Sequence, residues 1–142
     1  RTLAEDRRIV VDFDIQDDDP DANYSIARND FGRLVDNLLA NAVAASDETA
    51  LVHADLRSDD RALVVSILDE GIGMPEDFIP VAFDRFTRPE DARARSSGGS
   101  GLGLAIVAAI IASADGEISL TNRWPGLAVR ARIPRASEPV RQ

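Results

Sequence analysis

The chain carries the stretch Gly98-Gly99-Ser100-Gly101-Leu102-Gly103-Leu104-Ala105-Ile106-Val107, in which a glycine run passes directly into an apolar segment of helical length. Glycine lets the backbone adopt positive φ and approach a ligand closely. A helix that begins just after such a run directs unpaired N–H groups and the positive end of its dipole at that ligand. The stretch therefore predicts an anion site, and phosphate is the usual anion at such a place.

The composition fits a single globular domain. The chain has 142 residues, of which 44% are hydrophobic, and this is enough to bury a sizeable core without covalent cross-links. It contains no cysteine, which excludes a disulfide framework and any Cys-based metal site or nucleophile. We expect one domain over residues 1–142, with an ordered core over about residues 4–134 and a tail over residues 135–142.

The charged residues narrow the function classes. All 16 basic residues are arginine, and the lack of lysine excludes a Walker-type phosphate loop, which needs a Gly-Lys-Ser/Thr sequence. The net charge of −9 argues against nucleic acid as a partner. No apolar run approaches the roughly 20 residues of a membrane-spanning helix, and no signal peptide is visible. Because the chain begins at Arg1 without a Met, we expect it to be one domain of a larger protein.

Hydrophobic periodicity predicts an α+β fold. Apolar residues from Phe31 to Ala42 recur at helical spacing, which favours a helix capped by Asn29 or Asp30 and running to about Ser46. Further helices are expected over residues 76–81 and 102–114, and strands over residues 8–15, 50–56, 62–68, 116–121 and 127–133, with a further short strand over 24–26. This order predicts a two-layer α/β sandwich, a mixed sheet of about five strands with about three helices on one face.

Two asparagines stand out in the first long helix. Asn37 and Asn41 are four residues apart, so their side chains project from the same side of the helix, at the edge of its apolar stripe. Asparagine is unfavourable inside a helix because its side chain competes for backbone hydrogen bonds. Amide oxygens are suitable ligands for Mg²⁺, which usually bridges to substrate phosphates. The plainer alternative is that both residues only cap neighbouring loops.

A strand exit supplies a second group of candidates. The sequence Asp69-Glu70-Gly71-Ile72-Gly73 follows an apolar strand. A carboxylate there can accept a hydrogen bond from an exocyclic amine such as that of adenine, and the glycines let a flat ring lie against the backbone. The alternative is an ordinary turn, in which Asp and Gly occur for conformational reasons.

The third group is Phe83-Asp84-Arg85-Phe86-Thr87-Arg88, which opens a polar segment. The two aromatics suit a hydrophobic anchor for that segment. Arginine matches phosphate geometry, although solvated surface arginines are the more common case. The glycine run is also weak evidence by itself, because it does not follow a strand in a βαβ unit and so does not fit dinucleotide binding.

The order of these four groups carries more weight than any one of them. They resemble the N, G1, F and G2 boxes of the sensor histidine kinase catalytic domain, a branch of the Bergerat-fold (GHKL) ATPases, over nearly the whole chain. The resemblance implies that ATP is the substrate and Mg²⁺ the cofactor. It implies that Asn41 holds Mg²⁺, that Asn37 lies beside the phosphates, and that Asp69 binds the adenine amine.

The same resemblance assigns the remaining site residues. Gly71 and Gly73 are implied to shape the base pocket, Ile72 and Phe83 to contact the nucleotide, and residues 88–100 to form an ATP lid. Arg88 is implied to act near the γ-phosphate, so it is counted with Asn37 and Asn41 as catalytic. Nucleotide contacts are also implied for the glycine run and the first residues after it: Gly99, Ser100, Gly101, Leu102, Gly103 and Leu104.

Two departures bear on the reaction. Many members of the family follow the second Asn with Ala-x-Lys-Tyr or Ala-x-Arg-Tyr, whereas this chain has Ala44 and Ala45 at the basic and aromatic positions, which puts that phosphate contact in doubt. Hydrolytic relatives such as DNA gyrase carry a water-activating Glu four residues before the metal Asn. Here that position is Asn37, an amide that cannot act as a base, so hydrolysis is disfavoured.

The phosphate acceptor is expected outside this chain. The single histidine, His53, lies in a predicted strand without the sequence context of a phosphoacceptor. The resemblance implies an acceptor histidine on an upstream dimeric helical hairpin, a response regulator as partner, and a cytoplasmic domain of a membrane-anchored protein, with the isolated domain monomeric. Two alternatives remain open: a serine kinase of anti-sigma type in the same fold, and a non-catalytic nucleotide-binding scaffold.

Overall fold

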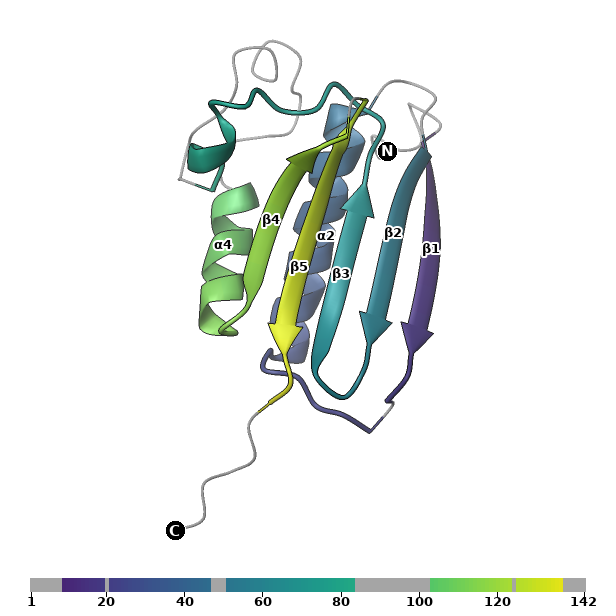
Figure 1. Ribbon diagram of the computed structural model, residues 1–142, viewed down its shortest axis with the longest axis vertical. Helices are drawn as coiled ribbons and strands as arrows, with labels where there is room; N and C mark the ends of the chain where they lie inside the picture. The colour runs from purple at the N-terminus through teal and green to yellow at the C-terminus, as the bar shows by residue number, and fades with distance from the viewer. Residues whose placement is uncertain (1–8, 20, 47–50, 84–102, 124, 137–142) are drawn as a thin grey trace.

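The computed structural model describes residues 9–19, 21–46, 51–83, 103–123 and 125–136 (Figure 1). In this part of the chain, one β-sheet is covered by helices on one face, with α2 (Arg28–Ala45) behind its centre and α4 (Gly103–Ser113) beside the strand at one edge. The predicted α+β two-layer sandwich is therefore confirmed.

Within the described residues, the sheet is mixed and has five strands. These are β1 (Val10–Asp17), β2 (Leu51–Ser58), β3 (Ala62–Leu68), β4 (Glu117–Asn122) and β5 (Leu127–Pro134). Their order across the sheet is β1-β2-β3-β5-β4. Only β1 and β2 run parallel, and the other neighbouring pairs are antiparallel. The short connections from β2 to β3 and from β4 to β5 make these pairs hairpins.

The helical layer differs in detail from the expectation of about three helices. Within the described residues there are two α-helices and a short 3-10 turn, Ile79–Val81, where a helix over 76–81 was predicted. Pro80 in this turn lacks an N–H and so suits only the first positions of a helix. The predicted strand over residues 24–26 is reduced to one isolated bridge, between Tyr24 and Arg135.

The start of α2 is also a correction. The helix begins at Arg28 after Ala27, and no side chain caps it. Asn29 and Asp30, which were expected as caps, lie instead inside its first turn, where the carboxylate of Asp30 interacts favourably with the helix dipole. The end of the helix agrees with the prediction, because Ser46 follows the last helical residue.

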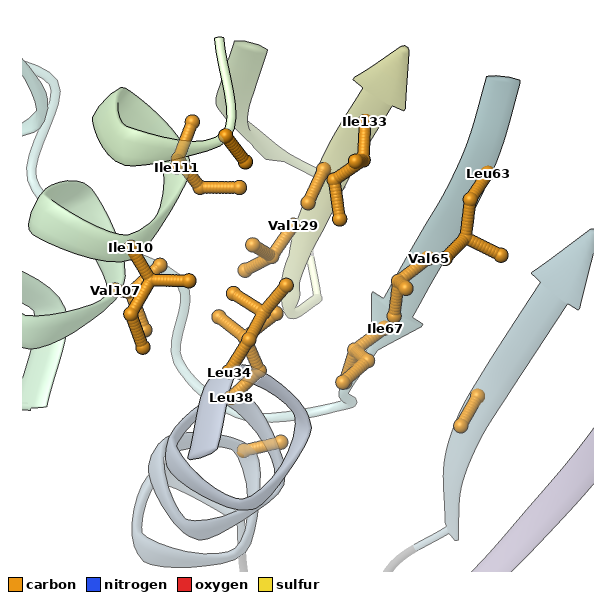
Figure 2. Packing of buried hydrophobic residues seen from close by; sticks show 14 of the residues in the cluster. Leu34, Leu38, Leu63, Val65, Ile67, Val107, Ile110, Ile111, Val129 and Ile133 are labelled. Atoms are coloured by element: carbon orange, nitrogen blue, oxygen red, sulfur yellow. The ribbon is translucent and has the colours of Figure 1, made fainter. Parts of the chain in front are cut away.

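The core joins both helices to the sheet (Figure 2). The α2 residues Leu34 and Leu38 are almost fully buried and point toward Val107 and Ile110 of α4. The strands contribute Leu63, Val65, Ile67, Val129 and Ile133 to the same cluster. Burying each large aliphatic side chain stabilises the fold by about 1.5–3 kcal/mol. This packing holds α2 and α4 against each other. It thereby fixes the positions of Asn37 and Asn41 of α2 relative to the beginning of α4.

No helix in the described part of the chain is long and apolar enough to cross a membrane. The predicted lid (residues 88–100) and most of the predicted tail (135–142) lie outside the described residues.

Candidate nucleotide-binding site

The first residue of α4 lies against the two asparagines of α2. A Cβ placed on Gly103 would be 3.4 Å from Oδ1 of Asn41 and 3.6 Å from Oδ1 of Asn37. Because glycine has no side chain, both amide groups can approach the N-terminal end of α4. The structure therefore brings together two sequence motifs that are more than 60 residues apart.

The two asparagines have different surroundings. Asn37 is half-buried, and its Nδ2 donates a hydrogen bond of 2.7 Å to the carbonyl oxygen of Arg33, one turn earlier in the helix. That bond uses the amide donor and leaves Oδ1 on the side of Gly103. Asn41 is exposed. Both lie in the body of α2, between Arg28 and Ala45, and not at its ends, so neither caps the helix.

The chemistry of this pair fits a magnesium-bound phosphate group. Amide oxygens are hard donors of the kind that Mg²⁺ accepts alongside phosphate oxygens and water. Asn41 presents such an oxygen at the surface, beside a position that a side chain on residue 103 would cover. An α-helix leaves the N–H groups of its first turn without intrahelical partners, and such groups favour an anion.

Asp69 is the second candidate residue of the site. It follows β3 directly, and its side chain is buried, with 4% of its surface exposed. One carboxylate oxygen, Oδ1, accepts hydrogen bonds from the backbone N–H of Gly71, at 2.9 Å, and of Leu127, at 3.1 Å. Among the described residues no hydrogen-bond partner of Oδ2 is found. The carboxylate is therefore fixed through Oδ1 by two backbone N–H groups.

Burial shifts the protonation of this carboxyl. Desolvation raises the pKa of Asp69 above its ordinary value, and the two backbone N–H bonds oppose that shift by stabilising the charged form. Burial and hydrogen bonding therefore act in opposite directions on this carboxyl, and burial has the larger effect.

The loop after Asp69 packs against the end of α2. A Cβ on Gly71 would collide with the carbonyl oxygen of Ala45, so only glycine allows this close approach. Gly73 adopts φ +77°, a conformation that side chains disfavour. Between them, Ile72 is 46% exposed. Since Ala45 is one helical turn beyond Asn41, this loop and the asparagine pair border the same end of α2.

Comparisons with known proteins identify the family of the chain. Residues 27–137 match the family model described as "Histidine kinase-, DNA gyrase B-, and HSP90-like ATPase". The chain is 39% identical over 122 residues to the sensor histidine kinase component HK1 of Mycobacterium tuberculosis, an alignment that covers 85% of this chain and 70% of HK1.

The chain belongs to the sensor histidine kinases, as an ATP-binding catalytic domain.

Other relatives show how much of a kinase this domain represents. It is 36% identical to sensor histidine kinase WalK of Bacillus subtilis over 102 residues, which is 70% of this chain but 17% of WalK. The mycobacterial sensor histidine kinase MprB, a solved structure, is 28% identical, with a TM-score of 0.74, covering 94% of this chain and 88% of that one. The chain thus spans most of HK1 and of the solved MprB chain but a small part of WalK.

The structure describes only some of the predicted site residues of this kinase domain. It brings Asn37, Asn41 and Gly103 together at one place. It also gathers Asp69, Gly71, Ile72 and Gly73 in one loop at the exit of β3. The catalytic candidate Arg88 and four nucleotide-binding candidates lie outside the described residues: Gly99, Ser100, Gly101 and Leu102.

The structure also describes two further residues that were predicted to contact the nucleotide, Leu104 and Phe83. Leu104 is partly buried and packs against the hydrophobic core, so its side chain supports α4. Phe83 is half-buried at the end of a described segment, next to the buried Ala82. Ala44 and Ala45, which replace the family's basic and aromatic residues, occupy the last turn of α2, where Ala45 contacts Gly71.

The residues of the β4–β5 hairpin that hold the loop after Asp69 were not predicted from the sequence. Leu127 donates its N–H to Asp69, Gly126 adopts φ +94° directly over the Asp69 carbonyl, and Asn122 bonds the backbone of Met74. The Pro125-Gly126 pair signals the turn between β4 and β5. Nothing in the sequence indicates that this turn supports the loop of Asp69.

Proposed function

We propose that this kinase domain binds Mg²⁺-ATP between the C-terminal half of α2, the Asp69 loop and the start of α4, and transfers the γ-phosphoryl group to a histidine on a dimeric helical hairpin of its full-length protein. The observation that carries the proposal is the approach of Gly103 to the amide groups of Asn37 and Asn41. It joins a metal-ligating oxygen and an anion-binding helix start in one place.

Each residue has a separate task in this proposal. Asn41 holds Mg²⁺, which neutralises phosphate charge when bound. The backbone N–H groups at the start of α4 hold the triphosphate. Asp69 fixes the base by accepting a hydrogen bond from the adenine amine, with the peptide units from Gly71 to Gly73 against the ring. The two ends of the nucleotide are thereby set against different elements of one packed core.

The reaction then needs positioning more than covalent chemistry from the protein. An imidazole nitrogen of the acceptor attacks the γ-phosphorus, a P–N bond forms, and the bond to the bridging oxygen breaks. ADP leaves with the bonding electrons, and the imidazole N–H proton passes to solvent. Asn37 occupies the position from which a Glu activates water in hydrolytic relatives. Its amide group cannot accept a proton from water, so hydrolysis of ATP is disfavoured.

The partners follow from this reaction. We propose that the phosphohistidine passes its phosphoryl group to the aspartate of a response regulator, and that the domain works on the cytoplasmic side of a membrane-anchored homodimer. The domain itself, residues 1–142, is proposed to be monomeric and to need the hairpin only as acceptor.

The test is a transfer assay with separate parts. The chain is mixed with γ-labelled ATP, Mg²⁺ and the purified helical hairpin from its full-length protein. We expect an acid-labile, base-stable label on the hairpin and little release of free phosphate. Rapid phosphate release without a labelled hairpin would make the domain a hydrolase. A label that survives acid would assign serine as the acceptor, as in kinases of anti-sigma type. Ala44 and Ala45, which replace a basic and an aromatic residue, are the reason to keep a third alternative, a non-catalytic scaffold. If the chain binds no nucleotide at millimolar concentration, it is such a scaffold.

A further inference from the structure

We propose that Asn122, at the end of β4, is a positioning residue for the nucleotide base, acting through the backbone of Met74. The inference deepens the proposed function and rests on it, since it concerns the adenine end of the same site. Its basis is a set of hydrogen bonds from the β4–β5 hairpin that holds both ends of the loop between Asp69 and Glu76.

Asn122 bonds both backbone groups of one residue. Its Oδ1 accepts the N–H of Met74 at 2.8 Å, and its Nδ2 donates to the carbonyl oxygen of Met74 at 2.7 Å. The side-chain amide thus pairs with the N–H and the C=O of one residue, as a residue of a neighbouring antiparallel strand does. The Nδ2 group also donates to Oε1 of Glu76 at 3.1 Å. A side chain that lacks either the donor or the acceptor cannot make this arrangement.

The same hairpin holds the beginning of the loop. The backbone N–H of Asp69 donates to the carbonyl of Leu127 at 3.1 Å, and the N–H of Leu127 donates to the Asp69 carboxylate at 3.1 Å. Gly126 packs so closely on Asp69 that a Cβ there would overlap the Asp69 carbonyl. Arg123 closes the turn by a bond of 2.9 Å from its N–H to the carbonyl of Gly126.

The stretch between these two attachments is the proposed base pocket. It contains Gly71 and Gly73, whose backbone freedom makes an unattached loop costly to order. Asn122 therefore keeps the loop in its binding shape before the nucleotide arrives, which lowers the entropic cost of binding. Because the described hydrogen bonds of its side chain go to Met74 and Glu76, its effect should fall on base binding and not on phosphoryl transfer.

The primary test compares Asn122→Ala with Thr121→Ala, a matched control at an exposed neighbouring position of β4. Affinity for Mg²⁺-ADP is measured by calorimetry, and transfer to the acceptor hairpin gives KM for ATP and kcat. Asn122→Ala removes all three side-chain hydrogen bonds. We expect it to weaken ADP binding about tenfold and to raise KM with kcat retained, because part of the free energy of those bonds is expressed in binding. Its preference for adenine over guanine nucleotides should fall. Thr121→Ala should match the wild type.

A second set of variants tests the same role in case Asn122→Ala does not fold. Asn122→Asp keeps an acceptor for the Met74 N–H but loses the donor and adds a charge beside Glu76. We expect weaker ADP binding than in the wild type, and a partial recovery when Glu76→Gln is added to Asn122→Asp. Glu76→Gln alone should bind nearly as the wild type does.

The outcomes separate this inference from the proposed function. If the wild type binds Mg²⁺-ADP but Asn122→Ala equals Thr121→Ala in affinity and base preference, the positioning role is overturned and the function stands. If Asn122→Ala does not fold, the Asn122→Asp series decides, and an Asn122→Asp variant with wild-type affinity overturns the role. A wild type that binds no nucleotide would instead overturn the proposed function.

Discussion

Gly103 meets Asn41 where α4 begins, so that a Cβ on the glycine would lie 3.4 Å from the amide oxygen of the asparagine. A distance of 3.4 Å is close to ordinary van der Waals contact, so a Cβ on residue 103 would touch the amide oxygen without strain. The approach of Gly103 to Asn41 places the metal-ligand candidate of one helix at the anion-binding end of the other. This relationship, more than any single motif, supports the proposed nucleotide site.

Substituting Gly103 should therefore affect binding more than folding. In Gly103→Ala, the methyl group fits beside the two asparagines but covers their oxygens. We expect affinity for Mg²⁺-ATP to fall by roughly tenfold, about 1.4 kcal/mol, with the fold retained. Gly32→Ala is the matched control, because a Cβ there meets nothing within 4 Å. Replacing this helical glycine should stabilise the domain by about 1 kcal/mol and leave binding unchanged. Equal affinities of the two variants would count against the site.

Asp69 offers a test of base recognition. In Asp69→Asn, Oδ1 is kept and can still accept from Gly71 and Leu127, but the second oxygen becomes an N–H donor. We expect the fold to survive and the preference for ATP over GTP to be lost, as measured by competition binding. In Asp69→Ala the two buried N–H groups lose their partner, which should lower the free energy of unfolding by about 1–3 kcal/mol. An Asp69→Asn variant with unchanged base preference would contradict the assignment.

The raised pKa of Asp69 predicts how stability depends on pH. The folded state binds the carboxyl proton more tightly than the unfolded chain, whose pKa is near the ordinary 3.8. The contribution of this group is therefore fully favourable below that value, and is lost as pH rises through the higher pKa of the folded state. Urea denaturation should show the wild type losing stability relative to Asp69→Asn over this interval. Asp59 does not interfere, because its lowered pKa, due to the N–H groups of Arg61 and Ala62, is common to both chains.

If the stability difference between wild type and Asp69→Asn stayed constant from pH 3 to pH 7, the carboxyl would titrate alike in both states. That result would mean that burial of Asp69 does not outweigh its two N–H bonds.

Gly126 should be intolerant of a side chain. It has φ +94°, and its missing Cβ would overlap the carbonyl of Asp69. We expect Gly126→Ala to cost about 2 kcal/mol of unfolding free energy or more, because both strain and overlap oppose it. Chemical denaturation measures this directly. A variant as stable as the wild type would show that the turn is not packed on the Asp69 loop.

Local patterns in the sequence predict much of the fold. The strand over residues 62–68 has the predicted bounds, and α2 follows the apolar spacing that places Leu34 and Leu38 in the core. The parallel pairing of β1 with β2 was not predicted, because it joins segments separated by a whole helix. The start of α2 was misplaced, since α2 begins after Ala27 without a side-chain cap and so lacks the usual signal.

The sequence likewise predicts some residues of the candidate site and not others. Asn37, Asn41 and Asp69 could be proposed because their side chains suit a nucleotide and their positions follow a familiar order. Asn122 could not, because its role depends on a contact with Met74 across 48 residues, and an asparagine at a strand end looks like ordinary turn chemistry. Supporting residues of this kind are visible only once the chain is folded.

In the proposed site, the Asp69 loop and the Asn41–Gly103 contact are two ends of one nucleotide pocket. Titration of the isotope-labelled chain with Mg²⁺-ADP and Mg²⁺-ATP, followed by backbone and side-chain amide NMR, tests it most directly. We predict that the amides of Gly71 to Met74, the side-chain amide of Asn41 and the N–H of Gly103 shift together with a single dissociation constant, and that Asn41→Ala removes the dependence on Mg²⁺. Shifts confined to one end, or two ends that titrate with different constants, would contradict the claim.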